Sequence, residues 1–172
     1  KGGIPGTELD GQILGVSAAE ISRKDGTIVW EWKSHEHFDV DLDVECPLAN
    51  RMVWGYTNSV DVFPNGDLLL SFRHFNTIGR VDRNSGKIVW RWGPEQLLGH
   101  QHCASVLDSG NVLVFDNGLH RKPYKKGDPQ EISSFEVSRA VEVNPDTDEI
   151  VWEYIDPLHL IYTNFCGSAQ RL

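Results

Sequence analysis

Polar side chains able to do chemistry recur at matching positions of an internal repeat. When the chain is aligned by its turns, Asn58 takes the position of His102, and Arg73 takes the position of Asn117. In a hairpin, the start of the first strand lies opposite the end of the second. Asn58 should therefore lie near Arg73, and His102 near Asn117. Four further residues share these strand ends: Tyr56, His74, His100 and His120. Convergent polar groups in a concave region indicate a binding or catalytic site.

Arg73 and His102 have side chains that suit an anionic substrate. The Arg73 guanidinium is a permanently charged, planar fork that matches sulfate, phosphate or carboxylate groups. The His102 imidazole titrates near neutral pH and is able to act as a nucleophile or as a general acid and base. Each residue also has a structural interpretation. Arg73 could form a salt bridge in this acidic chain, and His102 could simply be hydrogen-bonded to Asn117.

Two His-x-His pairs raise the alternative of a metal site. They are His35-Glu36-His37 and His100-Gln101-His102. Residues i and i+2 of a strand share a face, so either pair could offer two imidazoles to a transition metal. Two ligands do not complete a site, and a hydrogen-bonded structural pair is the simpler interpretation. A metal-dependent hydrolase or lyase using His37, His100 and His102 is nevertheless a rival hypothesis.

Short strands are the elements that must position these residues. The stretch Trp54–Trp92 holds four apolar runs, at Ser59–Phe63, Asp67–Phe72, Ile78–Asp82 and Lys87–Trp92. The first two are separated by Pro-Asn-Gly and the last two by Arg-Asn-Ser-Gly, which favour tight turns. The runs are too short for globular helices and rich in β-branched and aromatic residues. They predict one four-stranded antiparallel sheet.

The same unit recurs along the chain. SVLDSGNVLVFD at 105–116 repeats SVDVFPNGDLLLSF at 59–72. The second half of the unit occurs three times, ending at Trp32, Trp92 and Tyr154, and one repeat position is always tryptophan: Trp30, Trp90 and Trp152. A four-stranded repeat with a periodic aromatic residue is typical of a β-propeller blade. We expect these tryptophans to pack between neighbouring blades.

The repeat boundaries predict an all-β propeller of four-stranded antiparallel blades. Residues 16–32 supply half a blade, residues 54–92 and 100–154 supply one full blade each, and residues 163–172 begin another. A propeller ring has about four or more blades, and half-blades leave exposed sheet edges. We therefore expect missing blades of a longer chain, or another polypeptide, to complete the ring.

Two long connections interrupt this pattern. Residues 33–51 are acidic and carry two histidines, so they form either a functional loop or a solvated charged loop. Residues 117–137 are an insertion in the second full blade, and the start of the insertion is basic: Arg121, Lys122, Lys125 and Lys126. In an acidic protein, this insertion is either a solvated loop or a lid that favours anionic ligands.

Composition excludes several classes of function. The 172 residues carry a net charge of −9, which argues against nucleic acid as a partner. No apolar run approaches the length needed to span a membrane. The sequence starts at Lys1 and not at Met and shows no signal-peptide pattern, so we expect any targeting segment to have been removed or to lie outside the given residues. The three cysteines have no metal-type spacing and do not decide the redox compartment. Cys103 and Cys166, near the starts of blades, are expected to be small core residues, whereas Cys46 lies in the acidic connection.

Several sequence blocks, in their order and spacing, resemble one family. The blocks are TNSVDVFPNGDLLLSFRH, GHQHCASVLDSGNVLVFDNG, SRAVEVNPDTDEIVWEY and GSAQRL. Together they resemble the arylsulfotransferase family of bacterial β-propellers, over nearly the whole chain from about Ile21 onward. The resemblance implies a six-bladed ring, of which this chain holds about three blades' worth.

The resemblance also implies an activity. Family members transfer a sulfuryl group from a phenolic sulfate ester to a phenol through a sulfated histidine, without a nucleotide donor, so no cofactor is expected. His102 matches the nucleophile, Arg73 matches the arginine that binds the sulfuryl oxygens, and Asn58 matches an asparagine beside it. An arginine and amide donors suit the charge that develops on those oxygens. The remaining substrate-site residues are expected to be Tyr56, His37, His74, His100, Asn117 and His120. A periplasmic or secreted location is expected.

The chain departs from the family pattern at three positions. Tyr56 stands where the family has a histidine, His100 replaces a glycine, and Cys103 replaces an aspartate. These differences leave open a changed donor or acceptor, or another activity on the same scaffold. A propeller that binds a ligand without catalysis is the third hypothesis.

Overall fold

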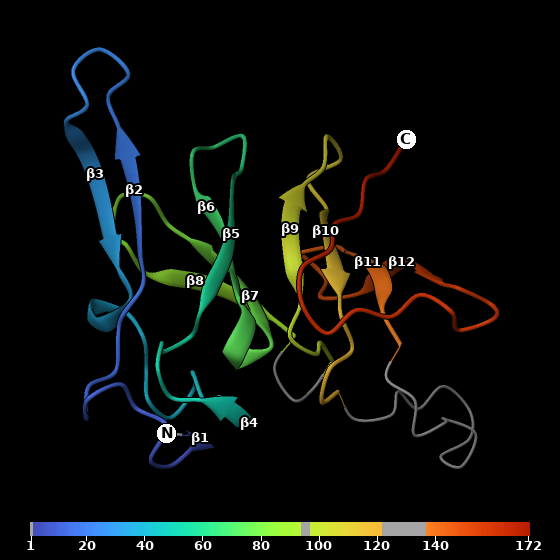
Figure 1. The fold of residues 1–172 in the computed structure, drawn as a ribbon. Helices are drawn as coiled ribbons and strands as arrows, with labels where there is room; N and C mark the ends of the chain where they lie inside the picture. Colours follow the sequence, from blue (N-terminus) through green and yellow to red (C-terminus); the bar gives the residue numbers. More distant parts are fainter. Residues whose placement is uncertain (1, 94–96, 122–136) are drawn as a thin grey trace.

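The chain folds into two four-stranded sheets and two strand pairs (Figure 1). The computed structural model describes residues 2–93, 97–121 and 137–172. Within these ranges the helical structure is limited to two single turns of 3-10 helix, η1 (Ser34–Glu36) and η2 (Arg73–Phe75). The fold class predicted from the sequence is confirmed: the protein is all-β and built from four-stranded antiparallel blades.

The first full blade consists of β5 (Thr57–Val62), β6 (Leu68–Phe72), β7 (Thr77–Val81) and β8 (Ile88–Trp92). These strands are hydrogen-bonded in chain order, and every pairing is antiparallel. Gly66 closes the first turn, donating its N–H to Phe63 O at 2.8 Å. Both β6 and β7 are almost wholly buried, because they lie between neighbouring strands and neighbouring sheets.

The second full blade repeats this plan, and a hairpin precedes the first. Its strands are β9 (His102–Val106), β10 (Val112–Asp116), β11 (Arg139–Val143) and β12 (Ile150–Ile155). The hairpin of β2 (Ser17–Ile21) and β3 (Ile28–Lys33) corresponds to the predicted half-blade. The first strands of the two full blades, β5 and β9, lie side by side, with Ala104 N–H donating to Ser59 Oγ at 3.0 Å.

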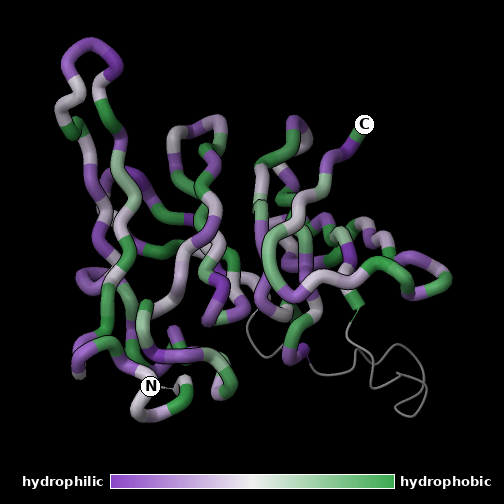
Figure 2. The backbone as a smooth tube through the Cα atoms, viewed as in Figure 1, coloured by the Kyte–Doolittle hydropathy of each residue, from purple (hydrophilic) through white to green (hydrophobic). Residues whose placement is uncertain are grey.

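Apolar contacts between sheets hold the blades together. One buried cluster joins the β2–β3 hairpin to the first blade, and its members are Trp32, Leu68, Leu70, Phe72, Phe75 and Val81. A second cluster joins the two full blades, and it includes Phe63, Leu69, Ile78, Trp92, Leu98, Val112 and Val141. Figure 2 shows the complementary pattern, in which the β2–β3 turn is strongly hydrophilic.

Of the tryptophans expected between blades, Trp30 and Trp90 pack there, whereas Trp152 lies under Arg171. Two further tryptophans donate hydrogen bonds across the same boundaries. Trp32 Nε1 donates to Gly86 O at 2.8 Å, in the turn between β7 and β8. Trp92 makes the equivalent bond to Asp148 O at 3.1 Å, in the turn between β11 and β12. Each blade is therefore fastened to a turn of the next one.

A strand pair that the sequence did not predict lies beside the blades. β1 (Gly2–Ile4) and β4 (Glu45–Asn50) pair in parallel, and β4 lies within the acidic connection 33–51. Neither segment has the alternation of a typical strand. Their pairing depends on long-range contacts, such as the bond from Arg51 Nε to Gly2 O at 2.7 Å.

The last residues cross the second blade without forming a strand that pairs with it. Thr163 N–H donates to Ser138 Oγ at 3.0 Å, and Arg171 pairs with Glu142 at 3.1 Å and covers the Trp152 ring at 4.2 Å. That residues 163–172 begin a further blade stays a prediction. No described helix has the length and apolar character needed to cross a membrane.

Candidate active site

The strand ends predicted to converge do meet at one end of the blades. Thr57 is paired with Phe72 across β5 and β6, and His102 with Phe115 across β9 and β10. This end faces β4 at the bottom of Figure 1. We call it the histidine rim, and it comprises residues 56–58, 73–76, 100–102, 117 and 120.

His102 is held by the side chain of Asn117. The distance from His102 Nδ1 to Asn117 Oδ1 is 2.7 Å. The Asn117 amide nitrogen donates to Thr163 O at 3.0 Å and to Cys166 O at 2.7 Å. Because both amide hydrogens are committed to carbonyl oxygens, the Asn117 oxygen faces His102 and must accept a hydrogen from Nδ1.

This hydrogen bond determines the tautomer of His102. With the hydrogen on Nδ1, the lone pair of the neutral ring lies on Nε2. Burial and the charge of Arg73 lower the pKa of His102, although the Asn117 hydrogen bond partly opposes them. The imidazole is therefore neutral at neutral pH, which is the state required of a nucleophile.

Arg73 is half-buried at the neighbouring strand end. Its guanidinium carbon lies 5.7 Å from the centre of the Tyr56 ring, within the range of a cation–π contact. Burial lowers the pKa of Arg73, but a guanidinium remains charged at any ordinary pH. The side chain makes no ion pair with a carboxylate among the described residues. The salt-bridge interpretation of Arg73 is therefore not supported.

Arg73 and His102 both face the segment Asn164–Cys166. Arg73 Nη2 donates to Asn164 O at 3.4 Å, and Cys166 N–H donates to His102 Nε2 at 3.3 Å. These two long contacts place a cation and a nitrogen lone pair around the same short piece of chain. The lone pair of Nε2 and the Arg73 guanidinium are therefore both directed toward the segment Asn164–Cys166.

Asn58 lies between the two blades. Its amide nitrogen donates to Gln101 O at 2.8 Å, which ties the start of β5 to the residue preceding His102. Its Oδ1 atom is buried and has no hydrogen-bond partner among the described residues. Asn58 thus fixes the spacing of Arg73 and His102 more directly than it offers a donor to a substrate.

The remaining predicted residues form a layer of aromatic and imidazole rings. Tyr56 stacks on His74 with ring centres 5.1 Å apart. His74 lies 6.0 Å from His100, and His100 meets His120 edge to face at 5.0 Å. Tyr56 is exposed, whereas His74 and His100 are almost completely buried.

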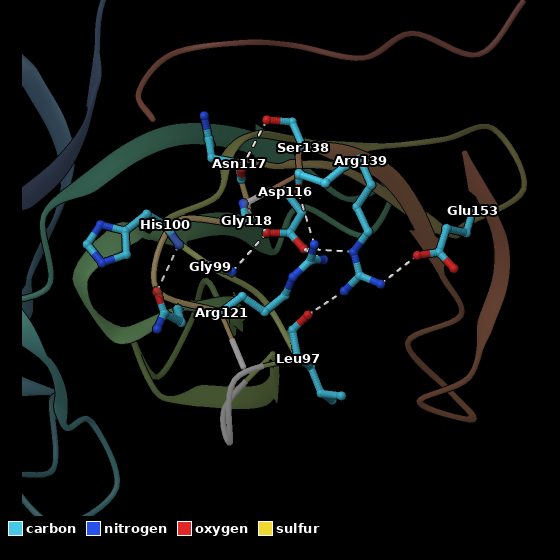
Figure 3. A network of polar contacts seen from close by, with 12 residues as sticks. Leu97, Gly99, His100, Asp116, Asn117, Gly118, Arg121, Ser138, Arg139 and Glu153 are labelled. Atoms are coloured by element: carbon cyan, nitrogen blue, oxygen red, sulfur yellow. Dashed lines mark hydrogen bonds and ion pairs between the residues drawn. The ribbon is translucent and has the colours of Figure 1, made fainter. Parts of the chain in front are cut away.

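A buried ion-pair network supports the second half of the rim (Figure 3). Asp116 accepts hydrogen bonds from Arg139 Nε at 2.8 Å, Arg121 Nη1 at 2.6 Å and Gly99 N at 2.8 Å. Burial acts to lower the pKa of Arg139, but the carboxylates of Asp116 and Glu153 outweigh it and raise that pKa. The network holds the residues that precede His100 and those that follow Asn117.

Backbone strain is concentrated at the same rim. Tyr56, His100 and Cys103 have φ values of +44°, +54° and +50°, although none is glycine. Such a conformation costs about 1–2 kcal/mol per residue. At Gly118, φ is +81° and an added Cβ would lie 2.1 Å from Val137 O, so only glycine fits immediately after Asn117.

The structure does not bring His37 to this site. His37 stacks on Trp32 with ring centres 5.4 Å apart and lies against the turn at Gly86. His35-Glu36-His37 spans η1 and not a strand, so the shared-face argument for this pair was wrong. The metal set of His37, His100 and His102 is therefore not assembled. His100 instead lies near His120 and Cys46.

Sequence reasoning missed three participants in the rim. Cys46 Sγ lies 3.6 Å from His120 Nδ1, and Glu45 Oε1 lies 3.5 Å from His74 Nδ1. Glu45 and Cys46 come from β4, whose sequence carries no strand pattern. The available signal was the odd number of cysteines, which left Cys46 without an assigned role. Cys166 is exposed, and its N–H caps His102, so its predicted core position was wrong.

The basic insertion is described only at its ends. Arg121, one of the four cations noted there, pairs with Asp116 and is not available to a ligand. Lys122, Lys125 and Lys126 lie outside the described residues, as does most of the proposed lid.

Comparison with solved structures gives a distant likeness. A protein of unknown function from Bacteroides caccae, solved as a crystal structure at 1.35 Å resolution, aligns with a TM-score of 0.45 and 15% identity. The alignment covers 85% of this chain and 61% of that one. No curated protein matches the sequence.

Comparison with protein families gives a match over the first part of the chain. Residues 16–99 match the family model described as arylsulfotransferase (ASST). The matched range includes Asn58 and Arg73 and ends before His102. The match confirms the resemblance over residues 16–99, and the later sequence blocks lie beyond it.

Proposed function

We propose, from the arylsulfotransferase family match of residues 16–99, that this protein transfers a sulfuryl group from a phenolic sulfate ester to a phenol through a sulfated His102. The observation that carries the proposal is the Asn117–His102 pair beside Arg73. It supplies a neutral imidazole with its lone pair on Nε2 and a cation next to it. No nucleotide donor or other cofactor takes part.

In the first step, His102 Nε2 attacks the sulfur atom of the aryl sulfate. The N–S bond forms as the bond from sulfur to the phenolic oxygen breaks, and the phenolate leaves with the bonding electrons. The ring becomes cationic, and the Asn117 oxygen stabilises it by accepting a hydrogen bond from Nδ1–H, which keeps its proton. In the second step, an acceptor phenolate attacks sulfur and the N–S electrons return to Nε2.

Arg73 is proposed to bind the oxygens of the sulfuryl group in transit. Negative charge spreads over these oxygens in the transition state, and a fixed donor in a partly buried site stabilises it strongly. The Cys166 N–H, now 3.3 Å from Nε2, would have to release the lone pair before attack. We expect this weak contact to be exchanged for one with a sulfuryl oxygen.

The blades are further proposed to belong to a closed ring in a periplasmic or secreted protein. Support comes from β2, which is paired with β3 alone among the described strands, whereas β6 and β7 each have two neighbours. The missing partners would be blades of a longer chain or of another polypeptide.

The test uses an aryl sulfate donor and a phenol acceptor, and follows both phenol release and label on the protein. We expect transfer, with one sulfuryl group bound to His102 when the acceptor is left out. His102→Ala should abolish both signals, while His35→Ala, an exposed histidine in η1, should keep them. Turnover that survives in His102→Ala, or the absence of transfer to any phenol, would overturn the proposal in favour of a binding propeller.

A further inference from the structure

Three potential metal ligands meet beside the sulfuryl-transfer residues. Cys46 Sγ and the imidazole nitrogens of His100 and His120 all lie within 4.8 Å of one another. They come from β4, from the residues before β9 and from the residues after β10. We propose that Cys46, His100 and His120 bind a divalent metal ion of the zinc type.

The spacing of the ligand atoms fits a shared metal ion as well as it fits a hydrogen bond. Cys46 Sγ and His120 Nδ1 are 3.6 Å apart. In a tetrahedral zinc site, Zn–S and Zn–N bonds of about 2.3 and 2.05 Å put sulfur and nitrogen about 3.6 Å apart. The observed distance is therefore compatible with two ligands on one ion.

The His100 side chain is buried and lacks a hydrogen bond among the described residues. Its side chain is 2% exposed, and neither ring nitrogen has a hydrogen-bond partner among the described residues. A buried polar group without a partner costs about 1–3 kcal/mol, and a metal ion would satisfy one of the two nitrogens.

The surrounding charges decide which metal is suitable. Arg73 opposes a cation here, while Glu45, across His74, favours one. A Cys46 thiolate would reduce the charge of a divalent ion by one unit. One thiolate and two imidazoles are a donor set preferred by zinc, and carboxylate-seeking ions such as magnesium and calcium are disfavoured.

Three protein ligands leave a fourth position open. A cavity of about 330 Å³ borders the cluster and is lined by Glu45, Cys46, Asn76 and His120, among others. His102 is not part of the set, because its two nitrogens contact Asn117 and Cys166. Metal binding is thus independent of the proposed sulfuryl transfer, and the experiment reads the metal and not the activity.

The first measurement adds cobalt(II), then zinc(II), to the metal-free, reduced protein. We expect one equivalent of cobalt to give visible bands of tetrahedral intensity and a thiolate charge-transfer band, both displaced by zinc. X-ray absorption of the zinc form should show one sulfur at about 2.3 Å and nitrogen ligands at about 2.0 Å. No stoichiometric binding, or a zinc shell without sulfur, would overturn the proposal, and neither measurement needs a variant.

Variants then assign the ligands. Cys46→Ser should remove the charge-transfer band, and His120→Ala should weaken zinc binding by about 100-fold or more. The matched controls are Cys103→Ser and His35→Ala, which alter residues outside the cluster and should bind metal as the parent does. A charge-transfer band that persists in Cys46→Ser, or vanishes in Cys103→Ser, would refute the assignment.

Discussion

Asn117 contacts three groups at once, and these contacts give His102 a defined chemical state. Its oxygen accepts from His102 Nδ1, and its nitrogen donates to Thr163 O and Cys166 O. Without the two carbonyl acceptors, the Asn117 side-chain amide could flip by about 180°. Its NH₂ group would then face His102 and favour the tautomer with the lone pair on Nδ1. The last residues of the chain therefore contribute to the chemistry through Asn117.

Replacing Asn117 should impair the chemical step and not substrate binding. Asn117→Leu removes the acceptor for Nδ1, so Nε2 carries the hydrogen in part of the molecules. We expect kcat to fall by about 10²–10⁴-fold, as when an orienting partner of a catalytic histidine is lost, with KM changed little. Aryl sulfate kinetics measure this, with Asn111→Leu in the β9–β10 turn as control. A rise in KM at constant kcat would contradict the assignment.

Arg73→Lys should separate charge from geometry. Lysine keeps the positive charge but cannot offer two parallel N–H donors to sulfuryl oxygens. We expect kcat/KM for an aryl sulfate to fall by about 10²-fold. Arg83→Lys, in the β7–β8 turn where Arg83 pairs with Glu20, is the matched control and should keep full activity. Equal rates for Arg73→Lys and the parent would show that Arg73 does not bind the transferred group.

At the scale of elements, the last strand of each blade fastens that blade to the next. Trp32 and Trp92 occupy equivalent positions and donate to Gly86 O and Asp148 O. Tyr154 holds the third such position and is exposed within the described part of the structure. This repeat position is therefore buried in the first two copies and exposed in the third.

Because Trp92 is buried and Tyr154 is exposed, we expect similar substitutions at the two positions to lower the unfolding free energy by different amounts. Trp92→Phe removes the bond to Asp148 O and leaves a smaller ring, so we expect a loss of about 1–3 kcal/mol of unfolding free energy. Tyr154→Phe alters the exposed equivalent and should change stability by less than about 0.5 kcal/mol. Urea unfolding followed by circular dichroism measures both. Similar losses for the two variants would argue against blade fastening by Trp92.

The turn between β5 and β6 should give stability a dependence on pH. Burial acts to raise the pKa of Asp67, but hydrogen bonds from Asn65, Arg80 and the Arg83 N–H outweigh it, and the net pKa is lowered. The carboxylate therefore contributes stability that is present above the unfolded pKa of about 4. That stability is lost as the pH falls through the lower, folded value.

Asp67→Asn should accordingly destabilise the protein at pH 7, by about 1–3 kcal/mol for hydrogen bonds to a charged group. The difference from the parent should shrink as the pH falls below about 4. Unfolding at a series of pH values tests this, with the exposed Asp146→Asn as control. A penalty that stays constant down to the lowest pH would rule out the ionised Asp67 as its source.

At the scale of the whole molecule, the inner side of the half-blade is open. A cavity of about 920 Å³ lies between β2 and β5 and is lined by Ala18, Trp30, Val60, Val62, Leu68 and Leu70, among others. Val60 is 59% exposed and Ile28 is 60% exposed. Apolar surface beside an open strand edge favours association with further strands, which is consistent with the proposed closure of the ring.

The mass of the purified protein tests this closure. We expect light scattering to give a mass above that of one 172-residue chain, and Val60→Lys to lower that mass by placing a charge in the cavity. Val151→Lys, on the outer strand β12, should leave the assembly intact. A single-chain mass for the unmodified protein would contradict closure of the ring by another polypeptide, and an unchanged mass in Val60→Lys would contradict association through this cavity.

Local sequence determined the blades, the placement of Arg73 at the start of β5 beside Tyr56, and the pairing of His102 with Asn117. Strand alternation and turn residues act over a few positions, so these patterns can be recognised in the sequence before the tertiary structure is known. The tertiary structure decided the rest. Cys46 and Glu45 join the rim through a parallel β1–β4 pair without a local pattern, Cys166 reaches His102 across 64 residues, and His37 goes to a tryptophan instead. Such contacts between distant segments depend on how whole sheets pack, which no short stretch of sequence encodes.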